Sequence, residues 1–283
     1  MKPGVFPALV FAAILPASGF CQQLTYPWKT DNEPTESLER RIPVPHGFKR
    51  IEVKPGSFAD WLRHLPLKPG CPPVHLYNGA LKDNQTVHVA VVDIDVGRRD
   101  LQQCADAVIR LRAEYLFTTP CSDKIAFHFT SGDFARWRDW GAGYRPKVKH
   151  NRVTWRRSAR RDRSHANFRR YLATVFAYAG SASLQRELTP VTHPSAIQIG
   201  DVFIRGGHPG HAVIVVDAAQ NAHGERVFLL AQSYMPAQDI HILHSPEDVD
   251  PWYRARGSGD LLTPEWTFQY TDLRRFPTTR CEK

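Results

Sequence analysis

The sequence has no long apolar run beyond its first 21 residues. A helix needs about 18 or more consecutive apolar residues to cross a bilayer. We therefore expect no transmembrane segment in the mature chain. Internal repeats and low-complexity tracts are also missing, which argues against a repeat architecture.

Metal-binding motifs are scarce as well. The pairs His208/His211 and His241/His244 have separations of three residues, which suit metal ligation. However, no cysteine pair and no glutamate-bearing helical zinc motif accompanies them. A histidine metal site is therefore the least favoured of three functions that we consider, and we predict neither a metal nor a cofactor.

Cysteines are few, and the first of the five closes an N-terminal segment with the features of a signal peptide. An apolar run from Val5 to Pro16 is followed by the small residues Ala17 and Gly19, and then by Cys21. We predict a signal peptide over residues 1–21, cleaved after Gly19 or after Cys21. Lipidation of Cys21 is the less favoured alternative. The protein is thus expected to be exported, either periplasmic or secreted.

Export permits disulfides among the four remaining cysteines, which are Cys71, Cys104, Cys121 and Cys281. Cys71 and Cys121 follow prolines in loop-like sequence and are candidates to pair with each other. That pairing would leave Cys104 free or bound to Cys281. A disulfide at Cys104 would remove the only thiol for which the sequence indicates a chemical role.

The chain has 283 residues, of which 42% are hydrophobic, enough for one substantial core. We predict an extended, proline-punctuated arm over residues 22–47 and a single elaborated domain over residues 48–283. Apolar strands near Val202, Val213, Leu229 and Ile240 follow one another closely enough to form an antiparallel meander. Helices before and among strands indicate the α+β class.

A helix is predicted from Asp100 to Phe117, because apolar residues recur from Cys104 to Tyr115 at helical spacing. Asp100 is available as its N-terminal cap. Cys104 then lies in the opening turn. A helix N-terminus and a neighbouring imidazole both lower the pKa of a thiol from its usual value of about 8.5. This placement favours a thiolate nucleophile.

We expect other charged residues in and near this helix to have structural roles. Asp106, Arg110 and Glu114 fall on one helical row, either as a side-chain ladder beside the site or, as we favour, as a solvated face. Asp201 follows Gly200 in a predicted turn. We expect its carboxylate to accept backbone hydrogen bonds there.

His211 begins a later apolar strand, and the strand after it ends at Gln232. A cysteine paired with a histidine is the arrangement for thiol-based acyl chemistry. The hairpin between the strands brings either Gln232 or Ser233 opposite His211, depending on register. We favour Gln232, because its side-chain carbonyl can accept from one ring nitrogen and leave the other facing sulfur.

The order of these parts resembles that of the papain-like cell-wall peptidases of the NlpC/P60 type. There the nucleophilic cysteine begins a helix, a Gly-Asp turn opens the first core strand, and a Gly-His pair opens the second. The resemblance implies an antiparallel sheet packed against the helix, with Cys104 as nucleophile, His211 as general base and acid, and Gln232 as orienting residue. It implies a cysteine hydrolase or acyltransferase acting on an amide bond of a cell-envelope substrate such as a peptidoglycan peptide.

Longer stretches of the chain resemble one bacterial family, called domain of unknown function 4846. They are Cys104-Ala-Asp-Ala-Val-Ile-Arg-Leu-Arg-Ala-Glu-Tyr-Leu, Gly200-Asp-Val-Phe-Ile, Pro209-Gly-His-Ala-Val-Ile-Val-Val-Asp and Ala231-Gln-Ser-Tyr-Met-Pro-Ala-Gln. This resemblance covers nearly the whole mature chain. It implies an exported bacterial protein and carries no activity of its own.

The net charge of +9 indicates anionic surroundings. Basic residues concentrate between Arg145 and Arg170, beside several aromatic residues, a mixture that can cradle polyanions or stack on sugars. The residues predicted to bind substrate are Trp137, Trp140, Tyr144, Arg156 and Arg157. We expect a cell-envelope peptide or glycan as partner, with an anionic polymer as a further candidate and no nucleic acid. A non-catalytic envelope protein that binds glycans or polyanions is the alternative function.

Overall fold

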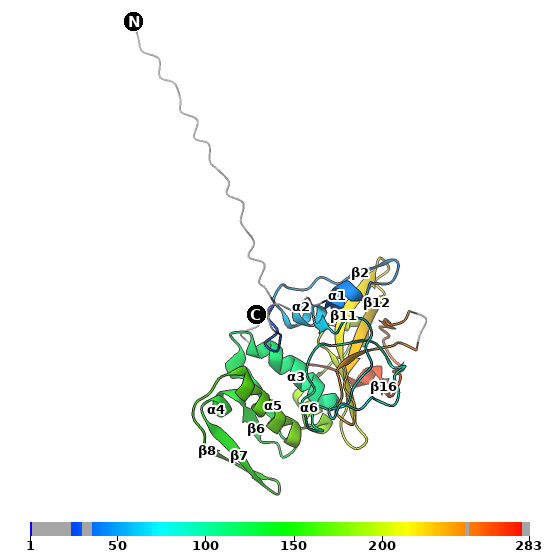
Figure 1. Cartoon of the computed structure of the whole chain (residues 1–283). Coiled ribbons are helices and arrows are strands. Elements are labelled where there is room, and N and C mark those ends of the chain that lie inside the picture. The colour runs from blue at the N-terminus through cyan, green and yellow to red at the C-terminus, as the bar shows by residue number, and fades with distance from the viewer. Residues whose placement is uncertain (2–23, 30–35, 247–248, 279–283) are drawn as a thin grey trace.

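The computed structural model describes residues 1, 24–29, 36–246 and 249–278 (Figure 1). The predicted signal peptide beyond Met1, and both Cys21 and Cys281, lie outside the described residues. The structure is mixed α and β, with one large antiparallel sheet and few helices. Within the described residues, none of the helices combines the length and apolar character that a bilayer span requires.

The main sheet has nine strands, and all its pairings are antiparallel. Its order is β4 (His88–Val91), β13 (His241–Leu243), β12 (Arg226–Gln232), β11 (His211–Asn221), β10 (Val202–Arg205), β17 (Leu273–Arg275) and β9 (Thr189–Pro190). In addition, β2 (Phe48–Arg50) pairs with β11, and β14 (Tyr253–Arg254) pairs with β12. The four consecutive strands β10 to β13 form the predicted meander.

Four two-stranded pairs and several helices complete the fold. The pairs are β1 (Glu36–Ser37) with β3 (Pro66–Leu67), β5 (Ala126–His128) with β6 (Phe134–Arg136), β7 (Tyr144–Lys149) with β8 (Arg152–Arg157), and β15 (Asp260–Leu262) with β16 (Thr267–Gln269). The α-helices are α1 (Leu38–Arg41), α2 (Phe58–Arg63), α3 (Cys104–Phe117), α4 (Trp137–Gly141), α5 (His165–Tyr178) and α6 (Ser181–Glu187). Short 3₁₀ turns are η1 (Ser122–Lys124), η2 (Pro194–Ala196) and η3 (Tyr270–Asp272).

Helix α3 is buried on every side. It packs against β11, and its far side meets α5 (Figure 1). There the rings of Phe117 and Phe168 stack with their centres 4.5 Å apart. The charged row predicted as a solvated face is therefore inside the protein. Arg110 donates to Glu114 Oε1 over 3.3 Å and to Asp95 Oδ1 over 2.7 Å. Buried charges persist because they are paired in this way.

Parts of the segment predicted as an arm over residues 22–47 pack against the domain. Leu38 is fully buried and Ile42 is nearly so. Tyr26 also packs against Trp61, with ring centres 5.1 Å apart, and its hydroxyl donates to the Trp61 carbonyl. A few large side chains anchor this segment although its composition is polar.

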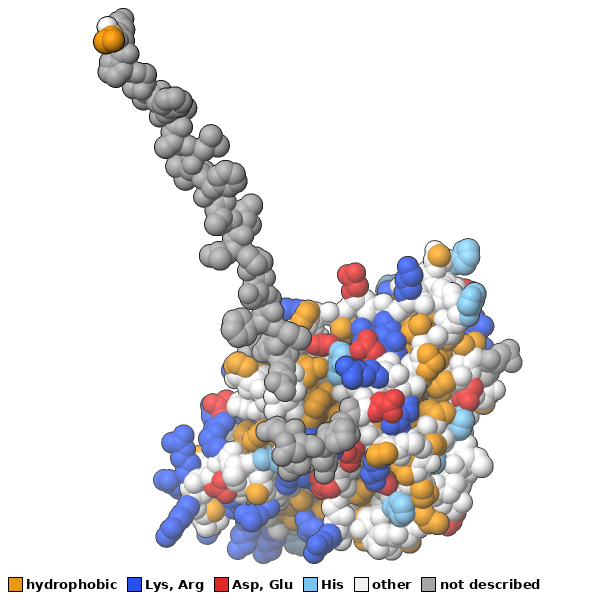
Figure 2. Space-filling model, turned by 45° about the horizontal axis from the view of Figure 1, so that its top comes forward, with side chains coloured by type: hydrophobic (Ala, Val, Ile, Leu, Met, Phe, Trp, Pro, Cys, Tyr) orange, Lys and Arg blue, Asp and Glu red, His pale blue; other side chains and the backbone are white. Residues whose placement is uncertain are grey.

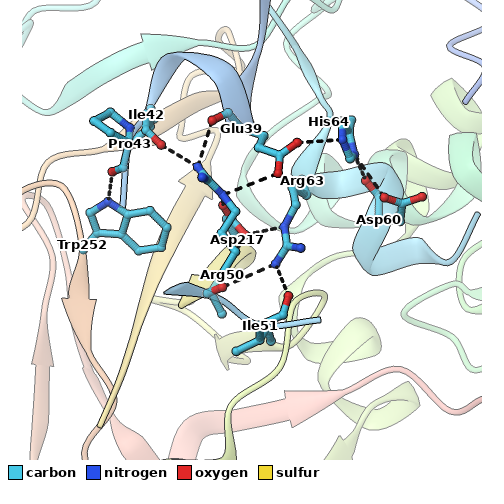
Figure 3. Close-up of polar contacts among 11 residues, drawn as sticks. Glu39, Ile42, Pro43, Arg50, Ile51, Asp60, Arg63, His64, Asp217 and Trp252 are labelled. Atoms are coloured by element: carbon cyan, nitrogen blue, oxygen red, sulfur yellow. Dashed lines mark hydrogen bonds and ion pairs between the residues drawn. The ribbon is translucent and has the colours of Figure 1, made fainter. Parts of the chain in front are cut away.

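A buried carboxylate joins this N-terminal region to the centre of the sheet (Figure 3). Asp217 of β11 is inaccessible to solvent and contacts the Nε atoms of Arg50 at 2.7 Å and Arg63 at 2.8 Å. Arg50 also donates to the Ile42 carbonyl, and Arg63 donates to that of Ile51. The strand register shifts beside Asp217, between Val215 and Asp217.

Removing the negative charge of Asp217 should destabilise the fold, because two guanidinium groups would lose their buried counter-charge. We expect Asp217→Asn to lower the free energy of unfolding by about 3 to 5 kcal/mol. Urea denaturation followed by circular dichroism measures this change. The control is Asp139→Asn, which breaks an exposed contact with Arg138 and should cost less than about 1 kcal/mol. Equal effects of the two substitutions would contradict the assigned role.

Candidate functional site

Cys104 is the first residue of α3, closer to the helix start than the sequence predicts. Gln103, not Asp100, is the N-terminal cap residue, and its backbone N–H donates to Asp106 Oδ2 over 3.2 Å. Asp100 instead accepts from the Gln103 side chain and from the Ala237 backbone N–H. It therefore ties the loop before α3 to the segment that follows β12.

His211 begins β11, and its Nε2 lies 2.9 Å from Gln232 Oε1. This is the hydrogen bond expected of an orienting residue. Ser233, the other candidate, turns away, and its hydroxyl lies 2.9 Å from the carbonyl oxygens of Gln102 and Gln238. With Nε2 donating to Gln232, the Nδ1 atom of His211 is the nitrogen left to accept a proton.

The amide of Gln232 is itself held in one orientation. Its Nε2 donates to Glu265 Oε2 over 2.8 Å, and Glu265 Oε1 contacts Lys82 Nζ at 2.6 Å. On the other side, Gln232 Nε2 lies 3.3 Å from the Nε2 of the buried His241, whose Nδ1 lies 2.9 Å from the Asp239 carbonyl oxygen. Both neighbours face the nitrogen of the amide, so its oxygen points to His211.

Cys104 and His211 line the same cavity, which has a volume of about 580 Å³. The sulfur also lies close to the start of β11, where the backbone N–H of Ala212 is near enough to act on the pKa of the thiol. Aromatic rings surround His211, with ring centres at 4.8 Å for Tyr234 and 5.4 Å for Trp266. Both rings line the cavity, as do the small residues where α5 gives way to α6, which are Ala179, Gly180, Ser181 and Ala182.

Burial raises the pKa of the Cys104 thiol to about 11, and the nearby Asp106 carboxyl adds to this rise. The N–H groups of Ala105, Ala212 and Cys104 itself act in the opposite direction but do not overcome burial. The expected lowering of this pKa is therefore wrong for the protein without ligand. Burial also lowers the pKa of His211 to about 4, although the hydrogen bond that its Nε2–H donates to Gln232 acts to raise this pKa. Both groups are neutral near pH 7.

The residues predicted to bind substrate do not reach this cavity. Trp137 is fully buried, with its ring 5.2 Å from that of Phe168. Trp140 is 6% exposed, and its indole N–H donates to Asn167. Because both rings belong to the core, neither can stack on a sugar. The other three residues of this set, Tyr144, Arg156 and Arg157, are exposed on the β7–β8 hairpin, away from the cavity.

Sequence reasoning missed four residues around His211: Lys82, Tyr234, Glu265 and Trp266. Tyr234 stands two positions after Gln232, so the same motif could have indicated it. Lys82 and Glu265 are separated by 183 residues and belong to loops. No local pattern connects them.

The predicted disulfide between Cys71 and Cys121 is not formed. Cys71 is free and exposed, Cys104 is free and half-buried, and Cys121 is disulfide-bonded. The thiol of Cys104 is therefore available. Within the described ranges, no three His, Cys, Asp or Glu side chains cluster as ligands for a metal ion.

Together the fold and the cavity define a mixed α/β protein in which a free cysteine at the start of a helix and an oriented histidine on an antiparallel sheet line one cavity. The chain belongs to the family described as Domain of unknown function (4846), whose model matches residues 38–275. Comparison with curated proteins and with solved structures gives no match.

The reactivity of Cys104 should follow the raised pKa of its thiol. Because the thiolate is the reactive form, alkylation by iodoacetamide should accelerate about tenfold per pH unit from about pH 7 to about pH 9. Peptide mass spectrometry distinguishes the adduct at Cys104 from that at the exposed Cys71, which serves as the internal reference. A rate at Cys104 that already levels off below about pH 7 would mean a preformed thiolate and contradict the assignment.

Proposed function

We propose that this protein is an exported cysteine-dependent hydrolase or acyltransferase that acts on an amide bond of a cell-envelope substrate, such as a peptidoglycan peptide. The observation that carries the proposal is the shared cavity of Cys104 and His211, with the far nitrogen of the imidazole held by Gln232. A nucleophile, a base and an orienting group in this order are the parts that acyl transfer needs.

The neutral state of both groups determines how the first step proceeds. As the Cys104 sulfur attacks the amide carbon, His211 Nδ1 removes the thiol proton, a C–S bond forms and the carbonyl electron pair moves to oxygen. The tetrahedral intermediate then expels the amine, which takes the proton from His211. In the second step water, or another acceptor, attacks the thioester with His211 again as base. The acyl product leaves and the thiol is restored.

The N–H groups that oppose the raised pKa of Cys104 are also candidates to stabilise the oxyanion. Those of Cys104 and Ala105 belong to the first turn of α3, where backbone donors have no partner one turn earlier. Donors fixed in this way stabilise charge that develops on a carbonyl oxygen. Helix α3 would thus supply both the nucleophile and part of the oxyanion hole.

The nature of the substrate is inferred from the cavity and from the likeness to NlpC/P60 peptidases. Tyr234, Trp266 and Phe176 offer apolar walls, while Ser181 and Asp100 offer polar atoms. This mixture suits a peptide with small and charged side chains. The alternative of a sugar-binding protein loses support, since the buried Trp137 and Trp140 provide no stacking platform.

Substituting either member of the pair tests the mechanism. Cys104→Ala and His211→Ala should each abolish release of peptide products from purified sacculi and muropeptides, measured by liquid chromatography and mass spectrometry. The matched control is Cys71→Ala, which removes the exposed free thiol outside the cavity. It should retain full activity. Turnover that persists in Cys104→Ala would refute the mechanism.

Glu265 should act as a positioning residue through Gln232. Glu265→Gln replaces a carboxylate, which only accepts, with an amide that can turn its own N–H₂ toward Gln232. We expect kcat to fall about tenfold to a hundredfold, with KM little changed. This loss is a part of the rate acceleration that a correctly oriented general base contributes. The control Glu225→Gln alters an exposed turn residue. Equal kcat values for both variants would exclude the role.

A further inference from the structure

The positive charge of the molecule is concentrated in one short segment. Residues 140–161 contain eight of the 37 Lys and Arg residues and none of the 28 Asp and Glu residues. The remainder of the chain is therefore close to neutral. This segment forms the β7–β8 hairpin and its base, and Figure 2 shows Lys and Arg side chains gathered at the lower left, where Figure 1 places the hairpin.

The register of the hairpin sorts its side chains onto two faces. Arg145 is paired with Arg156, and Lys149 is paired with Arg152. Since alternate residues share a face, these four lie on the same side as Lys147, and we call this side the cationic face. Along each strand, successive side chains of one face are about 6.6 to 6.8 Å apart.

The opposite face is anchored to the domain. Trp155 is half-buried, and its ring stacks at 6.2 Å on that of the buried Phe129. At the base, Arg145 of the cationic face is itself held, because its guanidinium lies 3.9 Å from the ring centre of Trp140 and donates to the Trp140 carbonyl. The hairpin is thus fixed, and the other charged residues of the cationic face are exposed to solvent.

Repulsion between these paired like charges destabilises the hairpin when no ligand is bound. Like charges directly opposite each other on paired strands are destabilising, and two such pairs occur here. In the part of the chain that the structure describes, none of Lys147, Lys149, Arg152 and Arg156 forms an ion pair with an acidic side chain. Their charges remain available to a partner.

We propose that the cationic face binds a linear polyanion, a polymer with phosphate-type groups repeated along an extended backbone. Thr154 is the only uncharged strand residue on this face, so no aromatic ring is available to stack on bases or sugars. The turn at His150 and Asn151 has no apolar side chain to insert into a bilayer. Recognition therefore rests on repeated charge, independently of the proposed catalytic activity.

Binding of fluorescently labelled long-chain inorganic polyphosphate to the mature protein, followed by anisotropy, tests the proposal. The hairpin variant carries Lys147→Gln, Lys149→Gln, Arg152→Gln and Arg156→Gln. The control loses the same charge at exposed positions elsewhere, through Lys49→Gln, Lys54→Gln, Arg98→Gln and Arg254→Gln. Far-ultraviolet circular dichroism and the Tm confirm that both variants are folded.

We expect the hairpin variant to bind at least about tenfold more weakly, and its slope of log affinity against log salt, from about 50 to about 200 mM, to be smaller by about 3. The control should change much less in both quantities. Equal losses in the two variants would mean a diffuse charge effect and overturn the proposal. Binding to vesicles of anionic phospholipid but not to polyphosphate would overturn it as well.

Discussion

The packing of α3 between the sheet and α5 is the constraint on which the site depends. From Ala105 to Leu116 the helix has no exposed residue, so its position against β11 cannot shift without opening the core. The same packing brings the first residue of the helix, Cys104, to the end of the sheet where β11 begins with His211. A catalytic pair would thereby be held by the core and not by mobile loops.

Burial also sets the electrostatics of the pair. A thiol and an imidazole that are both neutral form no ion pair before the reaction. Charge would develop on them only as the sulfur attacks. The role of the network from Gln232 to Glu265 and Lys82 is to keep the ring hydrogen of His211 on Nε2, so that Nδ1 can accept a proton. Groups that fix the orientation of a reacting side chain commonly determine whether a site functions.

Features that depend on local pattern could be predicted from the sequence. The meander β10 to β13 follows from closely spaced apolar strands, and the choice of Gln232 over Ser233 follows from side-chain chemistry. Burial around the helix could not be predicted in the same way. Arg110 and Glu114 read as a solvated row because their partners, Asp95 and His165, come from other segments. The sequence likewise suggests a binding surface at Trp137 and Trp140, because nothing in the local pattern shows that α5 covers both rings.

The ion pair between Lys82 and Glu265 has a further consequence for the order of assembly. Its two members come from opposite ends of the domain, one before α3 and the other near the last strands. During synthesis the orienting network cannot close until almost the whole chain is present. An incomplete chain would contain Cys104 and His211, but the tautomer of His211 would not be fixed. Any reactivity of the pair would therefore arise only at the end of folding.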